Sequence, residues 1–221
     1  MLRRILDMFG TATPKERRFV PSSPDLPELW PDSGTGANLD VLDTASTTTL
    51  TQLCDDYWNS FLDDGDSVVR DSRVQRRAME IIATRGTEAV SWARQRLAHD
   101  GYDAREDCAS LIAELAENDE LGNEKAAIAR DLVTLAVTPP KDDTKEAQAA
   151  GVALRALSVI GGTECMAAVR QVLTSPDWDD DENQWECADI LATMTSEPFM
   201  DAEDAVAEAK AWLNANPQTE A

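Results

Sequence analysis

The sequence predicts an all-α protein, built as an α-solenoid of about four stacked helix pairs. Three observations predict this fold class. Aromatic residues make up only 5% of the 221 residues while alanine is abundant, which favours helices over sheets. Apolar residues recur at helical spacing from about residue 46 onward. The same stretch contains an internal repeat, and a fixed period in this range is typical of stacked repeats.

Residues 1–45 are predicted to form an extended and largely irregular N-terminal arm, and residues 46–221 the solenoid. Five prolines fall within the first 31 residues, and residues 11–45 also collect Ser, Thr and Gly. Such a composition favours extended chain over regular structure. The arm nevertheless carries apolar side chains, including Phe19, Leu26 and Trp30. Docking onto the solenoid and binding of a partner are both left open for this arm.

One helix is predicted ahead of the repeats, near residues 47–62. Its apolar side chains recur three and four residues apart and define one face: Leu50, Leu53, Cys54, Tyr57, Trp58 and Phe61. The acidic cluster with Gly65 that follows is predicted to be a solvated turn, because it lacks the ligand order of a calcium loop.

The repeat is visible in two parallel series of large apolar residues. Leu97, Leu135, Leu173 and Leu213 are spaced 38, 38 and 40 residues apart, and Val90, Ile128, Met166 and Val206 have the same spacings. A third series, Ala93, Val169 and Ala209, is interrupted by Asp131.

Each repeat is predicted to hold two helices joined by a turn. Gly86, Gly122 and Gly162 supply the turns. The second helices are predicted to start at the capping residues Thr87, Asn123, Thr163 and Asp201. Prolines at 139, 140 and 176 separate successive pairs, because a helix must stop there.

This pattern resembles the HEAT-repeat family in its short bacterial form. The resemblance covers residues 71–98, 102–137, 145–174 and 182–214, and the segment Ala-Leu-Ser-Val-Ile-Gly-Gly at 156–162 is the best match. It implies a right-handed stack of helix pairs and a general binding scaffold, since such arrays serve many functions. Armadillo-like arrays are the structural alternative.

The charge balance predicts the kind of partner. Asp and Glu number 42 against 20 Lys and Arg, a formal net charge of −22. Such a surface repels nucleic acid and anionic membranes, and it attracts a basic protein. Solubility alone is the competing explanation for this acidity.

Residue counts argue against several enzyme classes. His99 is the single histidine, so a histidine-based metal centre is excluded and a catalytic triad is disfavoured. We expect no cofactor and no metal. Cys54, Cys108, Cys165 and Cys187 show no paired spacing and are predicted to be buried free thiols, which fits a reducing cytoplasm.

The candidate protein-binding residues lie in the C-terminal half. Trp178 is predicted to lie near the contact centre, because tryptophan with a charged rim is a preferred interface anchor. The competing interpretation makes Trp178 a cover for the junction between the third and fourth pairs, and Trp185 is expected in the core. The acidic residues assigned to the same surface are Asp177, Asp179, Asp180, Asp181, Glu182, Glu203, Asp204 and Glu208.

The function expected from these features is an acidic scaffold that binds a basic protein. Its most specific form is a bacterial immunity protein or antitoxin that blocks a cognate basic toxin domain. A general adaptor and an inhibitor that mimics nucleic acid are the alternatives. A carboxylate- or metal-dependent hydrolase is a third hypothesis, although no paired acid and base can be identified in the sequence.

Overall fold

The computed structural model describes most of the chain, namely residues 17–18, 26, 28–29, 37–64, 68–69, 72–139, 144–178 and 181–217. The chain divides into two compact units, Met1–Ala78 and Met79–Ala221. The division falls within helix α2 (Ser72–Ala83). The arm-to-solenoid boundary expected near residue 45 stays a prediction.

The first unit is built around helix α1 (Thr47–Asp64), which agrees with the predicted helix. Ser46 stabilises its start, because its Oγ accepts the backbone N–H of Thr49 at 3.1 Å. Leu50, Leu53 and Trp58 of the predicted face are buried. A 3-10 helix, η3 (Leu39–Thr44), precedes α1 and buries Leu42, so this stretch of the predicted arm has regular structure.

A two-residue parallel pairing also lies in the first unit. Strand β1 (Arg17–Arg18) pairs with strand β2 (Val68–Val69). Apart from this pairing, the regular structure of the described residues is helical, so the all-α prediction is confirmed.

The second unit contains the predicted succession of helices. After the end of α2 come α3 (Thr87–Arg96), α4 (Tyr102–Glu117), η5 (Gly122–Glu124), α5 (Lys125–Val137), α6 (Thr144–Ile160), α7 (Thr163–Thr174), α8 (Asp181–Thr195), η6 (Phe199–Asp201) and α9 (Ala205–Ala215). The pairs α4/α5, α6/α7 and α8/α9 coincide with the expected repeats.

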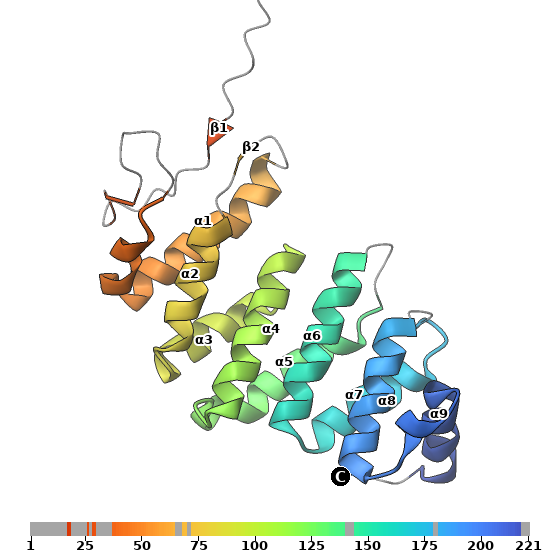
Figure 1. Ribbon diagram of the computed structural model, residues 1–221. Coiled ribbons are helices and arrows are strands. Elements are labelled where there is room, and N and C mark those ends of the chain that lie inside the picture. The colour runs from red at the N-terminus through yellow and green to blue at the C-terminus, as the bar shows by residue number, and fades with distance from the viewer. Residues whose placement is uncertain are drawn as a thin grey trace, which may run out of the picture. The chain divides into compact units, whose positions relative to one another are not determined.

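These helices form two layers. Helices α4, α6 and α8, the first of each pair, lie side by side, and α3, α5 and α7 lie behind them in the view of Figure 1. In the second layer α7 contacts both α5 and α9. The second unit is therefore a solenoid-like stack of helix pairs.

The first layer is tightly packed where α6 meets α8. A Cβ added at Gly151 of α6 would lie 2.5 Å from Oδ1 of Asn183. Asn183 is itself buried, and its amide nitrogen donates to the carbonyl oxygen of Ala147 at 2.9 Å. A side chain at 151 would therefore displace the buried amide of Asn183 from this hydrogen bond.

The turns within the pairs are made by glycine, as predicted. Gly86, Gly122 and Gly162 have φ of +59°, +53° and +88°, a region that side chains with a Cβ avoid. The predicted caps are wrong in detail. Gly86 and Gly162 occupy the cap positions of α3 and α7, so Thr87 and Thr163 are the first helical residues.

The core follows the apolar series of the repeat. Leu97, Leu173 and Leu213 are all buried, as are Val90, Ile128 and Met166 of the second series. Leu135 and Val206 are the exceptions, because both are only half-buried, and Leu135 lines a pocket. In the part of the chain that the structure describes, no helix is long and apolar enough to cross a membrane.

Candidate functional site

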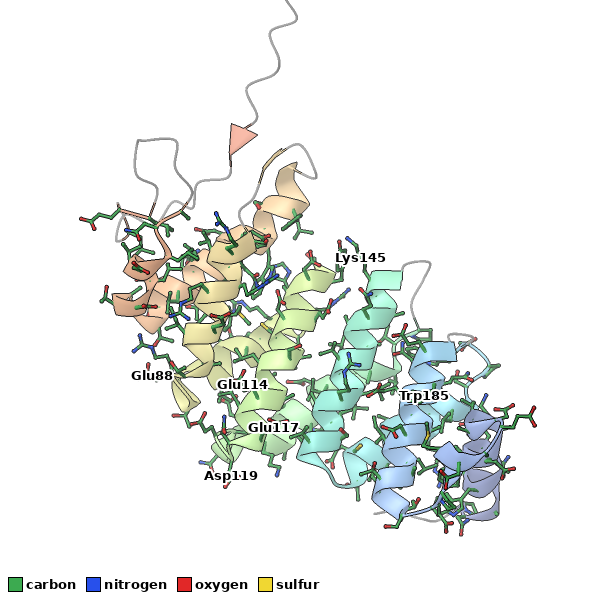
Figure 2. All side chains as sticks on the ribbon, in the orientation of Figure 1. Glu88, Glu114, Glu117, Asp119, Lys145 and Trp185 are labelled. Carbon is green, nitrogen blue, oxygen red and sulfur yellow. The ribbon has the colours of Figure 1, made fainter. Side chains whose placement is uncertain are left out.

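An exposed tryptophan lies on the outer side of α8. Trp185 is 52% exposed, one of few large apolar side chains that are exposed among the described residues. Glu182 and Asp189 lie three residues before and four residues after it, so the three share one face of the helix. Both acidic residues are exposed. Figure 2 shows Trp185 on α8, in the layer of first helices.

Glu186 adds a partly buried carboxylate beside this face. Burial raises the pKa of Glu186, the nearby Arg155 guanidinium lowers it, and the charges of Asp189 and Glu182 raise it again. Arg155 of α6 reaches Oε2 of Glu186 at 3.5 Å. Burial is the main reason why the pKa of Glu186 is raised, and the two neighbouring carboxylates add to it. We call Glu182, Trp185, Glu186 and Asp189 the α8 face.

Trp178, the predicted contact centre, is buried instead. Only 3% of it is exposed. Its indole Nε1 is buried and has no hydrogen-bond partner among the described residues. The backbone around it is held by a polar chain: Gln184 donates to the Trp178 carbonyl oxygen, and Lys210 donates to Oε1 of Gln184 at 2.9 Å.

The two tryptophans have therefore exchanged their expected places. The burial of Trp178 agrees with the competing interpretation, in which it covers a junction between helices. The expectation that Trp185 lies in the core is wrong. The periodicity of α8 contained the signal, because Cys187 and Leu191 define the buried face and Trp185 lies on the opposite side of the helix.

The predicted acidic residues lie near the starts of two successive helices. Asp177 and Glu182 are exposed around the start of α8, Asp181 is its first residue, and Asp179 and Asp180 lie outside the described residues. Glu203, Asp204 and Glu208 are exposed around the start of α9. The carboxylate of Asp204 accepts the backbone N–H of Ala207 at 2.9 Å. Asp204 thus caps α9, whereas the predicted cap Asp201 ends η6.

Charge is distributed unequally between the two layers. The first helices α4, α6 and α8 carry ten acidic and three basic residues. Their partners, the second helices α5, α7 and α9, carry three acidic and four basic residues. The outer surface of the first layer, which includes Glu114, Glu117 and Trp185 in Figure 2, is therefore the acidic one.

The second layer contains an ion-pair network around Arg94. Its Nε donates to Oδ2 of Asp131 at 2.6 Å, and its NH1 donates to Oε2 of Glu124 at 3.4 Å. Hydrogen bonding to Asp131 is the main reason why the pKa of Arg94 is raised. Arg94 of α3 therefore pairs with two carboxylates of the following repeat.

Arg170, the equivalent residue two repeats later, has different partners. It donates to the carbonyl oxygens of Leu213 and Asn216 at 3.3 and 3.0 Å. These carbonyls lie at the end of α9, where helix geometry leaves acceptors without intrahelical partners. Arg170 therefore contacts the following helix pair through its backbone carbonyls, whereas Arg94 does so through carboxylates.

A pocket of about 480 Å³ opens beside Arg94. Its lining comes from α3 and the two residues after it, the first turn of α4, η5 and α5, and includes Arg94, Arg105, Glu124, Asp131, Thr134 and Leu135. The pocket is lined by two guanidinium groups and two carboxylates, so its charges balance, and the net charge of the chain does not predict it.

The histidine and the four cysteines have structural roles in the fold. Nδ1 of His99 accepts the backbone N–H of Gly101 at 2.9 Å, so the imidazole takes part in a turn. All four cysteines are free and buried, as predicted. Burial raises the pKa of Cys165 to about 11 and the pKa of Cys187 still further. Among the described residues, no three His, Cys, Asp or Glu side chains are grouped so that they could hold a metal ion.

No family model, no curated protein and no solved structure matches this chain.

Proposed function

We propose that this chain is an acidic protein-binding scaffold that binds a basic protein through its first-helix layer. The observation that carries this proposal is Trp185, half exposed among the carboxylates of the α8 face. Tryptophan is enriched at the energetic centres of interfaces, and a charged rim selects a partner of opposite charge. The proposed centre is therefore Trp185, in place of the buried Trp178.

Electrostatic strain within the α8 face supports a basic partner. Burial raises the pKa of Glu186, and the charges of Asp189 and Glu182 raise it further, so its negative charge is disfavoured where it lies. A Lys or Arg side chain placed among them would relieve this repulsion. The distribution of charge between the layers supports the same face, since the second helices are slightly basic.

The architecture that we propose for the scaffold is a right-handed HEAT-like solenoid. The 38-residue spacing of its apolar series and the glycine turns within its pairs support this assignment. A rigid stack suits a binding function, because its exposed side chains are fixed by the packing of helices beneath them.

The most specific form of the proposal is a bacterial immunity protein or antitoxin that covers a basic toxin domain in the cytoplasm. The net charge of −22 supports rapid association with such a domain. The four free, buried thiols support a reducing compartment. Binding, not catalysis, is the proposed activity.

The test uses two baits, the wild-type chain and Trp185→Ala, to capture proteins from a lysate of the source cells. A partner is accepted only when its recovery depends on Trp185 and its purified form binds the purified chain. We expect a basic protein whose dissociation constant rises steeply with salt, because screening weakens association between opposite charges. Expression of the chain should also relieve the toxicity of that protein, and expression of Trp185→Ala should not.

Leu62→Ala is the matched control, since Leu62 is 51% exposed but lies in the first unit. It should bind the partner like wild type. An acidic partner, or a partner equally recovered by both baits, would contradict the proposal. A partner that binds but is not toxic would agree with the scaffold function and contradict the immunity function.

A further inference from the structure

The pocket beside Arg94 lies outside the α8 face and contains an unusual basic group. Arg105 comes from the first turn of α4 and lines the pocket together with residues of α3 and α5. Its side chain is only 22% exposed. A guanidinium carries five N–H donors, so one that is withdrawn from water needs several acceptors.

Arg105 lacks those acceptors among the described residues. Its Nε is buried and has no hydrogen-bond partner there. It forms an ion pair with Glu146, but NH2 and Oε1 are 3.8 Å apart, which is longer than a hydrogen bond. Arg94, by contrast, is held by both Asp131 and Glu124. Arg105 is thus the group in the pocket whose hydrogen-bonding capacity is least used.

Arg105 is suited to bind an anion, and the negative charges around the pocket favour an anion of low charge. A carboxylate matches the planar fork of a guanidinium and accepts two parallel hydrogen bonds. Glu124 and Asp131 also line the pocket, and the whole chain carries −22. A phosphate dianion would be repelled more strongly than a singly charged carboxylate. A monocarboxylate therefore fits best.

The remaining lining sets the shape of the ligand. Leu97, Ala98 and Leu135 supply apolar surface, and the half-exposure of Leu135 is explained by this opening. The volume of about 480 Å³ lies within the range of small-molecule sites. A short branched hydrocarbon body would cover the leucines while its carboxylate reaches Arg105.

We propose that this pocket binds a monocarboxylate with a small apolar body, with Arg105 as its anion-binding residue. The ligand is either a free short-chain carboxylic acid or the carboxyl terminus of a peptide that ends in a small apolar residue. The site is independent of the partner surface proposed above, since none of its lining residues belongs to the α8 face.

Titration calorimetry with 4-methylpentanoate tests the chemistry, with 4-methylpentanamide and inorganic phosphate as comparisons. The dissociation constant of 4-methylpentanoate should be below about 10 mM. The amide and phosphate should bind at least tenfold more weakly, because charged hydrogen bonds of this kind are worth about that factor. The Nε–H resonance of Arg105 should shift with the acid alone. Two peptides separate the sources: acetyl-Ala-Leu as free acid and as its amide. A peptide acid that binds tenfold tighter than 4-methylpentanoate identifies a peptide terminus, and otherwise a free acid is the ligand.

Two variants make the outcome decisive. Arg105→Lys should weaken binding about tenfold, because an ammonium cannot form the bidentate pair. Ala98→Trp fills the opening from an exposed position and should abolish binding, whereas Ala167→Trp on α7 is exposed outside the pocket and should not. Ala98→Trp remains decisive if Arg105→Lys fails to fold. Equal binding of acid and amide, unchanged binding by Ala98→Trp, or no binding of either acid would overturn the proposal.

Discussion

Arg94 and Asp131 join two successive helix pairs, with Nε and Oδ2 separated by 2.6 Å. The contact explains an irregularity in the repeat. Asp131 stands where the third apolar series has Ala93, Val169 and Ala209. An acidic residue at this position is favourable because α3 presents a guanidinium to it from the preceding pair.

Replacement of Asp131 by Ala should destabilise the chain only slightly. The two side chains are 36% and 41% exposed, and ion pairs that reach solvent contribute about 0.2–1 kcal/mol. Urea unfolding of wild type, Asp131→Ala, Arg94→Met and the double variant would give the coupling energy. A coupling above about 3 kcal/mol would show that the pair acts as a buried network, and none at all would show that it is incidental.

The two tryptophans of the fourth pair should respond oppositely to truncation. Trp178→Ala should lower the free energy of unfolding by about 3 kcal/mol or more, because it removes a buried indole. Trp185→Ala should change it by less than about 0.5 kcal/mol. Chemical denaturation followed by far-UV circular dichroism measures both. Equal effects would show that the assignment of buried and exposed tryptophans is wrong.

Gly151→Ala should destabilise the chain, although alanine is ordinarily preferred to glycine inside a helix. The new Cβ would lie 2.5 Å from Oδ1 of Asn183, and such overpacking costs about 1–3 kcal/mol. In the double variant Gly151→Ala/Asn183→Ala the clash is absent, so its loss of stability should be smaller than the sum of the single losses. A stabilising Gly151→Ala would mean that α6 and α8 are less closely packed than described.

The raised pKa of Glu186 should make the stability of the chain depend on pH. Burial raises its pKa above the ordinary value, so the folded chain holds this proton more tightly than the unfolded chain. Its contribution to stability is therefore lost as pH rises from about 4 through its raised pKa. Glu186→Gln should gain stability relative to wild type over that interval. A difference that does not change between pH 4 and 7 would contradict the shift.

Much of the fold followed from the sequence because the repeat is a property of the core. Leu97, Leu173 and Leu213 recur at the predicted spacing and are buried, and glycines with positive φ separate the paired helices. Periodicity fixes which face of a helix is apolar, and stacking of that face fixes the layers.

The candidate site was less predictable, since it depends on the surface. Trp178 precedes α8 in an acidic loop, and only the chain path reveals that Gln184 and Lys210 hold its backbone in place. The exposure of Trp185 is predictable from helical periodicity, because the buried residues Cys187 and Leu191 lie on the opposite side of α8. The pocket at Arg105 is not predictable in this way, because its lining residues come from three helices, and periodicity within one helix does not show which side chains of different helices meet.

If Trp185 anchors a basic partner, its removal must weaken that partner's binding. The dissociation constant of the partner should be measured for wild type and Trp185→Ala, at equal ionic strength and with both melting temperatures recorded. We predict an affinity loss of about 2 kcal/mol or more, roughly thirtyfold, with an unchanged melting temperature. Equal affinities for the two proteins would contradict it and would place the partner on another surface.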